Sequence, residues 1–172
     1  SSSKATCTAG NYCPSGKIIA CTSLGSNYTD SAAGSSANTQ CYIPKSKLSG
    51  KYVSASNTIT TCTEGYYCPG TNNIAYGATG GRNACAAGSY SSSGASACTA
   101  CGAGKTNGST TGQTSCTTAC SQTNVATWNT PSWSTDNTVS NICSIATCSA
   151  GYNLSSNTCV ANKITLTLKK DG

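Results

Sequence analysis

The chain has 172 residues, 14 cysteines and no histidine, and its net charge of +6 comes from ten basic and four acidic residues. It contains no Phe and no Met, and its strong aliphatic residues are only eight Ile, five Leu and four Val. So few large apolar side chains cannot offset the conformational entropy lost on folding. The composition therefore excludes an ordinary globular domain that is held together by a hydrophobic core.

The cysteines supply another source of stability. Small extracellular modules replace a core with disulfides, each of which contributes about 2–4 kcal/mol. Because the count is even, every cysteine can pair, and we interpret the chain as oxidised and as extracellular or displayed on a cell surface. We expect all fourteen to form disulfides: Cys7, Cys13, Cys21, Cys41, Cys62, Cys68, Cys85, Cys98, Cys101, Cys116, Cys120, Cys143, Cys148 and Cys159.

A short motif recurs along the chain. The sequence Cys-x-x-Gly recurs at Cys7, Cys62, Cys85, Cys101 and Cys148, and four of these segments place a tyrosine one or two residues after the glycine. Glycine allows a turn with positive φ, and a tyrosine ring can lie against a disulfide, so each segment predicts a pinned turn or hairpin. Units of this kind stack on their neighbours. We therefore predict a small disulfide-rich fold, an elongated array of short β-hairpins and irregular loops with little or no helix.

The chain divides into four parts. Residues 1–61 form an N-terminal cysteine-rich unit that includes a Ser/Asn/Thr-rich loop at 22–40, and residues 62–119 form a pair of cysteine-rich repeats. Residues 120–162 form a final unit, which contains both tryptophans. The fourth part, residues 163–172, forms a C-terminal tail.

The tail alternates Ile164, Leu166 and Leu168 with polar residues, which predicts a β-strand. Such a strand pairs back onto this domain, opens a following domain or augments a neighbouring copy, and the sequence leaves these alternatives open. The chain has no initiator Met and no apolar run long enough to cross a bilayer. We therefore expect a processed chain, or a segment of a longer protein, without a membrane span of its own.

The stretch from Cys85 to Cys116 carries a family resemblance. A loop of about a dozen residues closes between cysteines, and Cys98-x-x-Cys101 then leads into the next loop. This arrangement resembles the cysteine-rich repeat of ephrin-receptor and tumour-necrosis-factor-receptor ectodomains, and the repeats of protist and bacterial surface antigens. Residues 148–159 are similar to the last loop of an EGF-like module, and residues 164–172 look like the opening strand of an internalin-type B-repeat.

The resemblance implies three disulfides, Cys85–Cys98, Cys101–Cys116 and Cys148–Cys159, and Cys120–Cys143 then follows as the neighbouring pair. The pairing of the other six cysteines stays open. They fit a sequential scheme with Cys7–Cys13, Cys21–Cys41 and Cys62–Cys68, an interlocked scheme within residues 7–41, or a link between Cys41 and Cys62.

The residues that carry chemistry are few. Cys98, Cys101, Cys116 and Cys120 have the spacing of a four-cysteine zinc site, but ten further cysteines and the repeated motif favour disulfides. Without histidine, Ser-His and Cys-His nucleophilic pairs are excluded. The four acids are far apart in the sequence: Asp30, Glu64, Asp136 and Asp171. We expect no enzymatic activity, no cofactor and no metal ion.

The remaining candidate residues concern recognition. Asn27, Asn107 and Asn153 begin Asn-x-Ser/Thr sequons, which are acceptors for N-glycosylation. Trp128 and Trp133 either anchor a small local core or form an exposed pair that contacts a ligand. A basic cluster of Lys45, Lys47 and Lys51 is too sparse for a nucleic-acid interface.

Together these features predict an extracellular structural or adhesive surface module, such as a stalk segment or a filament subunit. Its expected partners are copies of itself, neighbouring surface proteins and glycans. The alternative is a receptor-like module that binds a protein or a glycan through its tryptophans and the loop at 22–40.

Overall fold

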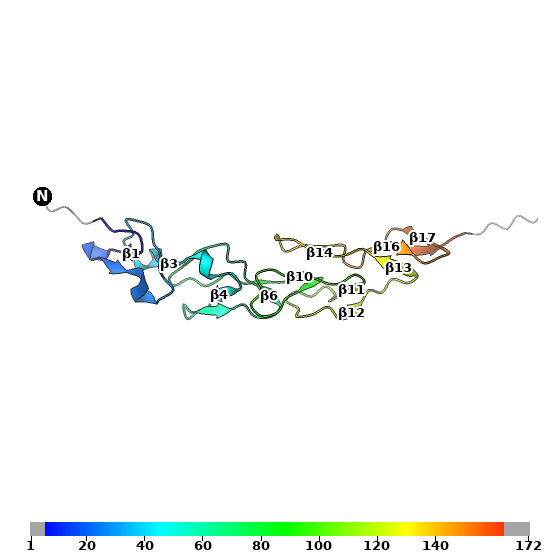
Figure 1. The fold of residues 1–172 in the computed structure, drawn as a ribbon, viewed down its shortest axis with the longest axis horizontal. Helices are drawn as coiled ribbons and strands as arrows, with labels where there is room; N and C mark the ends of the chain where they lie inside the picture. The colour runs from blue at the N-terminus through cyan, green and yellow to red at the C-terminus, as the bar shows by residue number, and fades with distance from the viewer. Residues whose placement is uncertain (1–5, 164–172) are drawn as a thin grey trace, which may run out of the picture.

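The computed structural model describes residues 6–163, which form an elongated chain of short antiparallel hairpins (Figure 1). Within this range every sheet has two strands, and the helices are 3-10 turns of three or four residues. The predicted fold class is thereby confirmed. The strand expected around Ile164, Leu166 and Leu168 lies outside the described residues.

The strands pair in hairpins along the chain. In the first half, β1 (Asn11–Tyr12) pairs with β2 (Ile19–Ala20), β3 (Tyr42–Ile43) with β7 (Ile74–Ala75), β4 (Lys51–Val53) with β5 (Ile59–Thr61), and β6 (Tyr66–Tyr67) with β8 (Asn83–Ala84). The short 3-10 turns are η1 (Pro14–Gly16), η2 (Cys21–Leu24), η3 (Asn38–Gln40) and η4 (Lys45–Lys47). Because β3 and β7 lie on either side of residue 61, strand pairing joins the first two of the expected parts of the chain.

The second half continues in the same way. The pairs are β9 (Ser89–Tyr90) with β10 (Thr99–Ala100), β11 (Lys105–Thr106) with β12 (Thr118–Ala119), β13 (Val125–Trp128) with β16 (Ile145–Cys148), β14 (Ser132–Trp133) with β15 (Val139–Ser140), and β17 (Tyr152–Ser155) with β18 (Thr158–Ala161). The hairpin of β14 and β15 is inserted between the paired strands β13 and β16.

A turn of one geometry starts six of the hairpins. In the first, the Asn11 N–H donates to the Thr8 carbonyl (3.2 Å), and Gly10 adopts a φ of 79°, which favours glycine. The N–H of Cys21 then returns to the Gly10 carbonyl (3.0 Å) and closes the hairpin. The same return bond, at 2.8–2.9 Å, joins Cys62 to Gly50, Cys85 to Gly65, Cys101 to Gly88, Cys120 to Gly104 and Asn162 to Gly151.

One of these six units is not visible in the cysteine pattern. The turn at Gly50 follows Leu48 and Ser49, with Lys47 in the place where the other units have a cysteine. Leu48 is buried there, and Gly50 has a φ of 69°. An apolar side chain therefore anchors this turn, where a disulfide anchors the others.

Seven disulfides join the fourteen cysteines, and each joins cysteines that are neighbours along the chain. The pairs are Cys7–Cys13, Cys21–Cys41, Cys62–Cys68, Cys85–Cys98, Cys101–Cys116, Cys120–Cys143 and Cys148–Cys159. For the first six cysteines the structure has the sequential scheme, and neither the interlocked scheme nor a link between Cys41 and Cys62 is present. The four cysteines with zinc-like spacing belong to three different disulfides, so they do not form a four-thiolate site.

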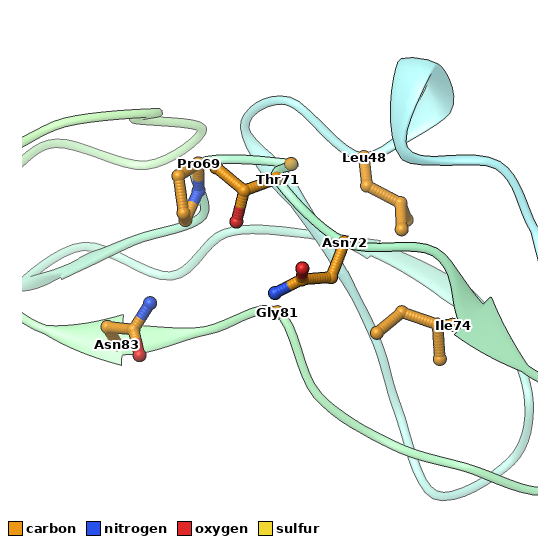
Figure 2. A pocket seen from close by; sticks show the side chains of 8 residues that line it. Leu48, Pro69, Thr71, Asn72, Ile74, Gly81 and Asn83 are labelled. Carbon is orange, nitrogen blue, oxygen red and sulfur yellow. The ribbon is translucent and has the colours of Figure 1, made fainter.

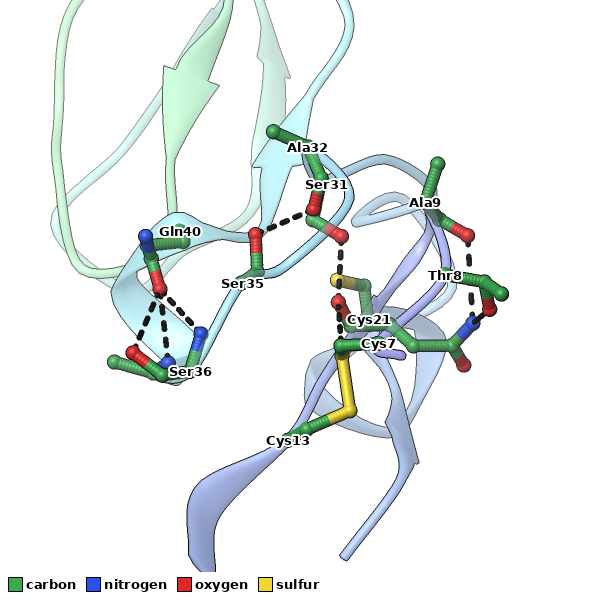
Figure 3. Close-up of a disulfide and its surroundings, with 12 residues drawn as sticks. Cys7, Thr8, Ala9, Cys13, Cys21, Ser31, Ala32, Ser35, Ser36 and Gln40 are labelled. Carbon is green, nitrogen blue, oxygen red and sulfur yellow. Dashed lines mark hydrogen bonds between the residues drawn. A yellow bond between two sulfur atoms is a disulfide. The ribbon is translucent and has the colours of Figure 1, made fainter. Parts of the chain in front are cut away.

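Two units share contacts beyond the repeated motif. In the unit of β1, the Ser31 hydroxyl donates to the Asn11 carbonyl (2.7 Å), close to the first disulfide (Figure 3). In the unit of β6, the Ser91 hydroxyl makes the same bond to the Tyr66 carbonyl (2.7 Å). Both serines are buried. The similarity between these two units therefore extends to part of the loop at 22–40.

The apolar core consists of two small clusters. The larger contains Tyr28, Ile43, Leu48 and Val53 together with the Cys21–Cys41 disulfide. The smaller contains Tyr67 and the Cys85–Cys98 disulfide, with the half-buried Trp133 packed against it. Sulfur thus supplies much of the buried apolar material in both clusters, as expected for a chain with few aliphatic residues.

The hairpin of β14 and β15 is an exception to the expected pattern, in which each unit contacts mainly its neighbours in the chain. It lies beside β10, as Figure 1 shows. The side chain of Asn137 fixes it there, because its Oδ1 accepts the Ala86 N–H (3.1 Å) and its Nδ2 donates to the Ala84 carbonyl (2.9 Å). These partners are 51 and 53 residues away in the sequence.

Candidate functional site

The two tryptophans lie in different surroundings, and both are half-buried. Trp128, in β13, covers Gly104, where a Cβ atom would lie only 2.7 Å from the indole ring. Trp133, in β14, packs edge-to-face against Tyr67 with 5.2 Å between the ring centroids. Each tryptophan therefore anchors local packing, in line with one of the two roles considered for them.

Trp133 also borders a hollow of about 300 Å³. The hollow is lined by Tyr67, Pro69, Thr71, Asn83, Ser96, Ala97, Trp133 and Thr135. One wall is aromatic, the others carry neutral polar side chains, and no lining residue is charged. Within the described part of the chain, the side chains of Thr71, Asn83, Ser96 and Thr135 have no hydrogen-bond partner in the protein.

A second hollow has a volume of about 140 Å³ (Figure 2). It is lined by Leu48, Pro69, Gly70, Thr71, Asn72, Ile74, Gly81 and Asn83, so the two hollows share Pro69, Thr71 and Asn83. In Figure 2, Leu48 and Ile74 lie at one end of this hollow, and Pro69 and Asn83 lie at the other. We refer to the two adjoining hollows, from Leu48 to Trp133, as the Trp133 groove.

The turn after β14 holds Trp133 in place. The hydroxyls of Ser134 and Thr138 donate to the Asp136 carboxylate, and these hydrogen bonds lower the pKa of Asp136 below its ordinary value. Asn137 adopts a positive φ of 64°, and its Oδ1 accepts the indole N–H of Trp133 (3.2 Å). The turn therefore fixes both the backbone and the ring orientation at this wall of the groove.

A turn of matching sequence occurs at residues 54–58. Ser54-Ala-Ser-Asn-Thr58 and Ser134-Thr-Asp-Asn-Thr138 both bond the N–H of their first residue to the carbonyl of their last (3.0 Å in each). Like Asn137, Asn57 has a positive φ (57°) and reaches across to another segment, where its Oδ1 accepts the Tyr28 hydroxyl (3.2 Å). The shared Ser-x-x-Asn-Thr pattern is the signal that could have identified these bridging asparagines.

Tyr28 lies at the centre of the larger core cluster and comes from the loop at 22–40. Its side chain is only 1% exposed, and Tyr76 packs edge-to-face on it at 5.2 Å. Burial raises the pKa of the Tyr28 phenol above its ordinary value, and the neighbouring Tyr76 raises it further. This part of the loop therefore serves packing.

Another hollow, of about 320 Å³, lies beside Arg82. The Arg82 guanidinium lies over two rings, 4.9 Å from the Tyr52 centroid and 4.5 Å from the Tyr66 centroid. Cation–π contact of this kind contributes about 0.5–1 kcal/mol at an exposed site. Because Tyr52 belongs to β4 and Tyr66 to β6, the arginine links two successive hairpin units.

The three sequons differ in accessibility. Asn107 uses both ends of its amide, since Oδ1 accepts the Gly88 N–H and Nδ2 donates to the Ser89 carbonyl (2.7 Å in each bond). Its nitrogen is therefore engaged in the folded chain. Asn153 is exposed on β17, and Asn27 is half-buried.

The other predicted residues are not gathered into a site. Lys45, Lys47 and Lys51 are exposed, and Asp171 lies outside the described residues. Between residues 6 and 163, no three of the His, Cys, Asp and Glu residues form a group that could hold a metal ion. In the same range, no helix is long and apolar enough to cross a membrane.

The fold and the groove define a disulfide-rich module of serial two-stranded hairpins. Comparison with known proteins found no matching protein family, no matching curated protein and no matching solved structure.

Proposed function

We propose that the protein is a rigid extracellular module with a structural or adhesive role, used as a stalk segment or as a subunit of a filament. The observation that carries this proposal is the serial closure of the hairpins. Six units are closed by the same bond back to a turn glycine, and the disulfides lie along the whole described length. A module of this design keeps its length without a large core.

The energetics agree with a role in which shape must persist outside the cell. Each native disulfide contributes about 2–4 kcal/mol by restricting the unfolded chain, whereas the two core clusters are small. Disulfides form and persist in oxidising compartments, so the chemistry that stabilises this chain is typical of secreted and surface proteins. The resemblance of residues 85–116 to extracellular cysteine-rich repeats supports the same assignment. We include in the proposal that the chain is not an enzyme, since it has no histidine.

Size-exclusion chromatography and electron microscopy of the purified, oxidised protein test this proposal. We expect elongated particles or fibres that lose their defined length after reduction of the disulfides. A compact globular particle, or a shape unchanged by complete reduction, would contradict it. The free thiol content of the freshly isolated protein is the control, and it should be close to zero before reduction.

The second candidate function is a receptor-like binding module, and a specific observation favours it. The Trp133 groove offers an aromatic wall and neutral polar groups without partners in the described part of the chain. Such a combination is typical of ligand sites, in which apolar surface supplies affinity and a few polar groups supply orientation. A stalk can also carry a binding site, so the two candidates do not exclude each other.

A further inference from the structure

We propose that the Trp133 groove binds a neutral oligosaccharide, with one sugar ring against Trp133 and a neighbouring ring in the hollow between Leu48 and Asn83. This inference rests on the second candidate function, the binding module, and names its ligand. It does not depend on the structural role. It rests on the composition of the groove, its shape and the rigidity of its walls.

The aromatic wall provides the apolar contact. Tyr67 is 6% exposed and forms the fixed base against which Trp133 packs. Trp133 is half-buried, so part of its indole faces the hollow. The face of an aromatic ring is negative and the C–H groups of a pyranose are weakly positive, so the two attract each other when the sugar lies on the ring.

The polar walls provide hydrogen bonds to hydroxyl groups. Thr71, Ser96 and Thr135 each carry a hydroxyl that can donate and accept, and Asn83 carries both an amide donor and an amide acceptor. These are the groups that complement sugar hydroxyls, which also act in both senses. Because they make no hydrogen bonds to the described protein, a ligand would not have to break any to reach them.

The charge of the groove selects the kind of glycan. None of the residues that line its two hollows is acidic or basic. Arg82 belongs to a separate hollow, where its guanidinium lies over two tyrosines. A carboxylated or sulfated glycan would gain no ion pair in the groove, so a neutral glycan fits better.

The size and shape of the groove agree with a short chain of sugars. The larger hollow, of about 300 Å³, is at the lower end of the range for small-molecule pockets. The smaller hollow lies next to it, since both are lined by Pro69, Thr71 and Asn83. An extended ligand would therefore bury more surface than a single sugar, and its affinity should rise with chain length from the order of millimolar.

The walls are pre-organised. Asn137 fixes the hairpin that carries Trp133, and the Cys85–Cys98 disulfide lies in the cluster against which this hairpin packs. On the opposite side, Gly70 lets residues 69–72 approach the backbone of Ser49, where a Cβ atom at residue 70 would lie 2.6 Å from the Ser49 nitrogen. Rigid walls reduce the entropy lost on binding.

Tryptophan fluorescence tests the proposal directly. The chain has two tryptophans, so Trp128→Phe leaves Trp133 as the sole indole. We expect titration of this variant with cellohexaose, laminarihexaose or chitohexaose to change its emission in a saturable manner. At least one of these neutral probes should bind more tightly than its own disaccharide, and addition of salt should leave the affinity unchanged.

Two further variants and one control connect the signal to the groove. Asn83→Ala removes an amide that has no partner in the described chain, so the fold should persist while the affinity falls about three- to tenfold. Asn162→Ala, an exposed asparagine far along the chain, is the matched control and should bind like the parent. Trp133→Ala removes the fluorescent reporter together with the aromatic wall, so its binding is measured by isothermal titration calorimetry. It should lose binding, provided that its thermal unfolding and disulfide content match those of the parent.

The proposal is overturned if none of the three oligosaccharides shows binding at a concentration about ten times the expected millimolar dissociation constant. It is also overturned if binding is the same in Asn83→Ala as in the parent, or if only a sulfated polymer or a proline-rich peptide changes the Trp133 emission. Any of these results would leave the structural role untouched, because that role is tested by particle shape and not by binding.

Discussion

Reduction of the disulfides should roughly double the length to which a single molecule can be stretched. The seven bonds join cysteines separated by 6, 20, 6, 13, 15, 23 and 11 residues. Together they enclose about 94 of the roughly 152 residue steps between Cys7 and Cys159, and these enclosed residues cannot extend while the bonds are intact. The pairing therefore sets the contour length of the unfolded, oxidised chain.

The magnitude follows from the geometry of an extended chain, at about 3.5 Å per residue. The roughly 58 free steps contribute about 200 Å, and the seven bridges, with Cα–Cα distances of 5.5–5.9 Å, add about 40 Å more. After complete reduction the same segment should reach about 530 Å. Force spectroscopy of molecules held just outside Cys7 and Cys159 measures both values.

The same experiment distinguishes the disulfide schemes that the sequence leaves open. If Cys7 paired with Cys21 and Cys13 with Cys41, the shortest covalent path from Cys7 to Cys41 would run along about six residue steps and one bridge, in place of about eight steps and two bridges in the sequential pairing. The oxidised chain would then be roughly 13 Å shorter. An oxidised length near that smaller value would refute the sequential pairing. An equal length with and without reductant would refute the conclusion that these cysteines are paired at all.

Three further predictions concern single residues. Asn137→Ala should lower the free energy of unfolding by about 2–3 kcal/mol, measured by denaturant titration, because it leaves the backbone groups of Ala84 and Ala86 without their partner. Gly65→Ala should cost about 3 kcal/mol or more in the same assay, since it combines a positive φ of 78° with a clash against the Gly112 carbonyl. Tyr28 has a raised pKa in the folded state, so its contribution to stability should be complete below pH 10 and should fall as pH rises through the folded pKa.

Each of these predictions has a matched control. Asn141 also has a positive φ (59°), but in the described part of the chain its side chain makes a single long hydrogen bond, of 3.5 Å to the Thr130 carbonyl, so Asn141→Ala should cost less than Asn137→Ala. Gly16→Ala carries the same φ strain, with nothing within 4 Å of the added Cβ, and should cost only about 1–2 kcal/mol. Tyr28→Phe should remove the part of the stability loss at high pH that comes from ionisation of Tyr28. Equal effects within either substitution pair, or an unchanged pH profile in Tyr28→Phe, would contradict the reasoning.

The sequence determined the fold class because the unit of this protein is local. A Cys-x-x-Gly turn needs only a glycine with positive φ and a hydrogen bond from the N–H of a cysteine 11–20 residues further on, as in the closures from Gly10 to Cys21 and from Gly88 to Cys101. A shortage of aliphatic residues and an even number of cysteines then favour a disulfide-rich array over a cored domain. The strongly periodic part of the chain was therefore readable without the structure.

Only the tertiary structure decided which distant segments meet. No repeat in the sequence links Asn137 to Ala84 and Ala86, or Trp133 to Tyr67. These contacts form because the hairpin of β14 and β15 folds back beside an earlier unit, where it meets backbone groups and an aromatic ring that can pair with it. The turn at Gly50, anchored by Leu48 in place of a cysteine, was hidden for a related reason, since apolar burial is set by the surroundings and not by a motif. The groove beside Trp133 forms where these long-range contacts bring the hairpins together, and so it could not be read from the order of residues alone.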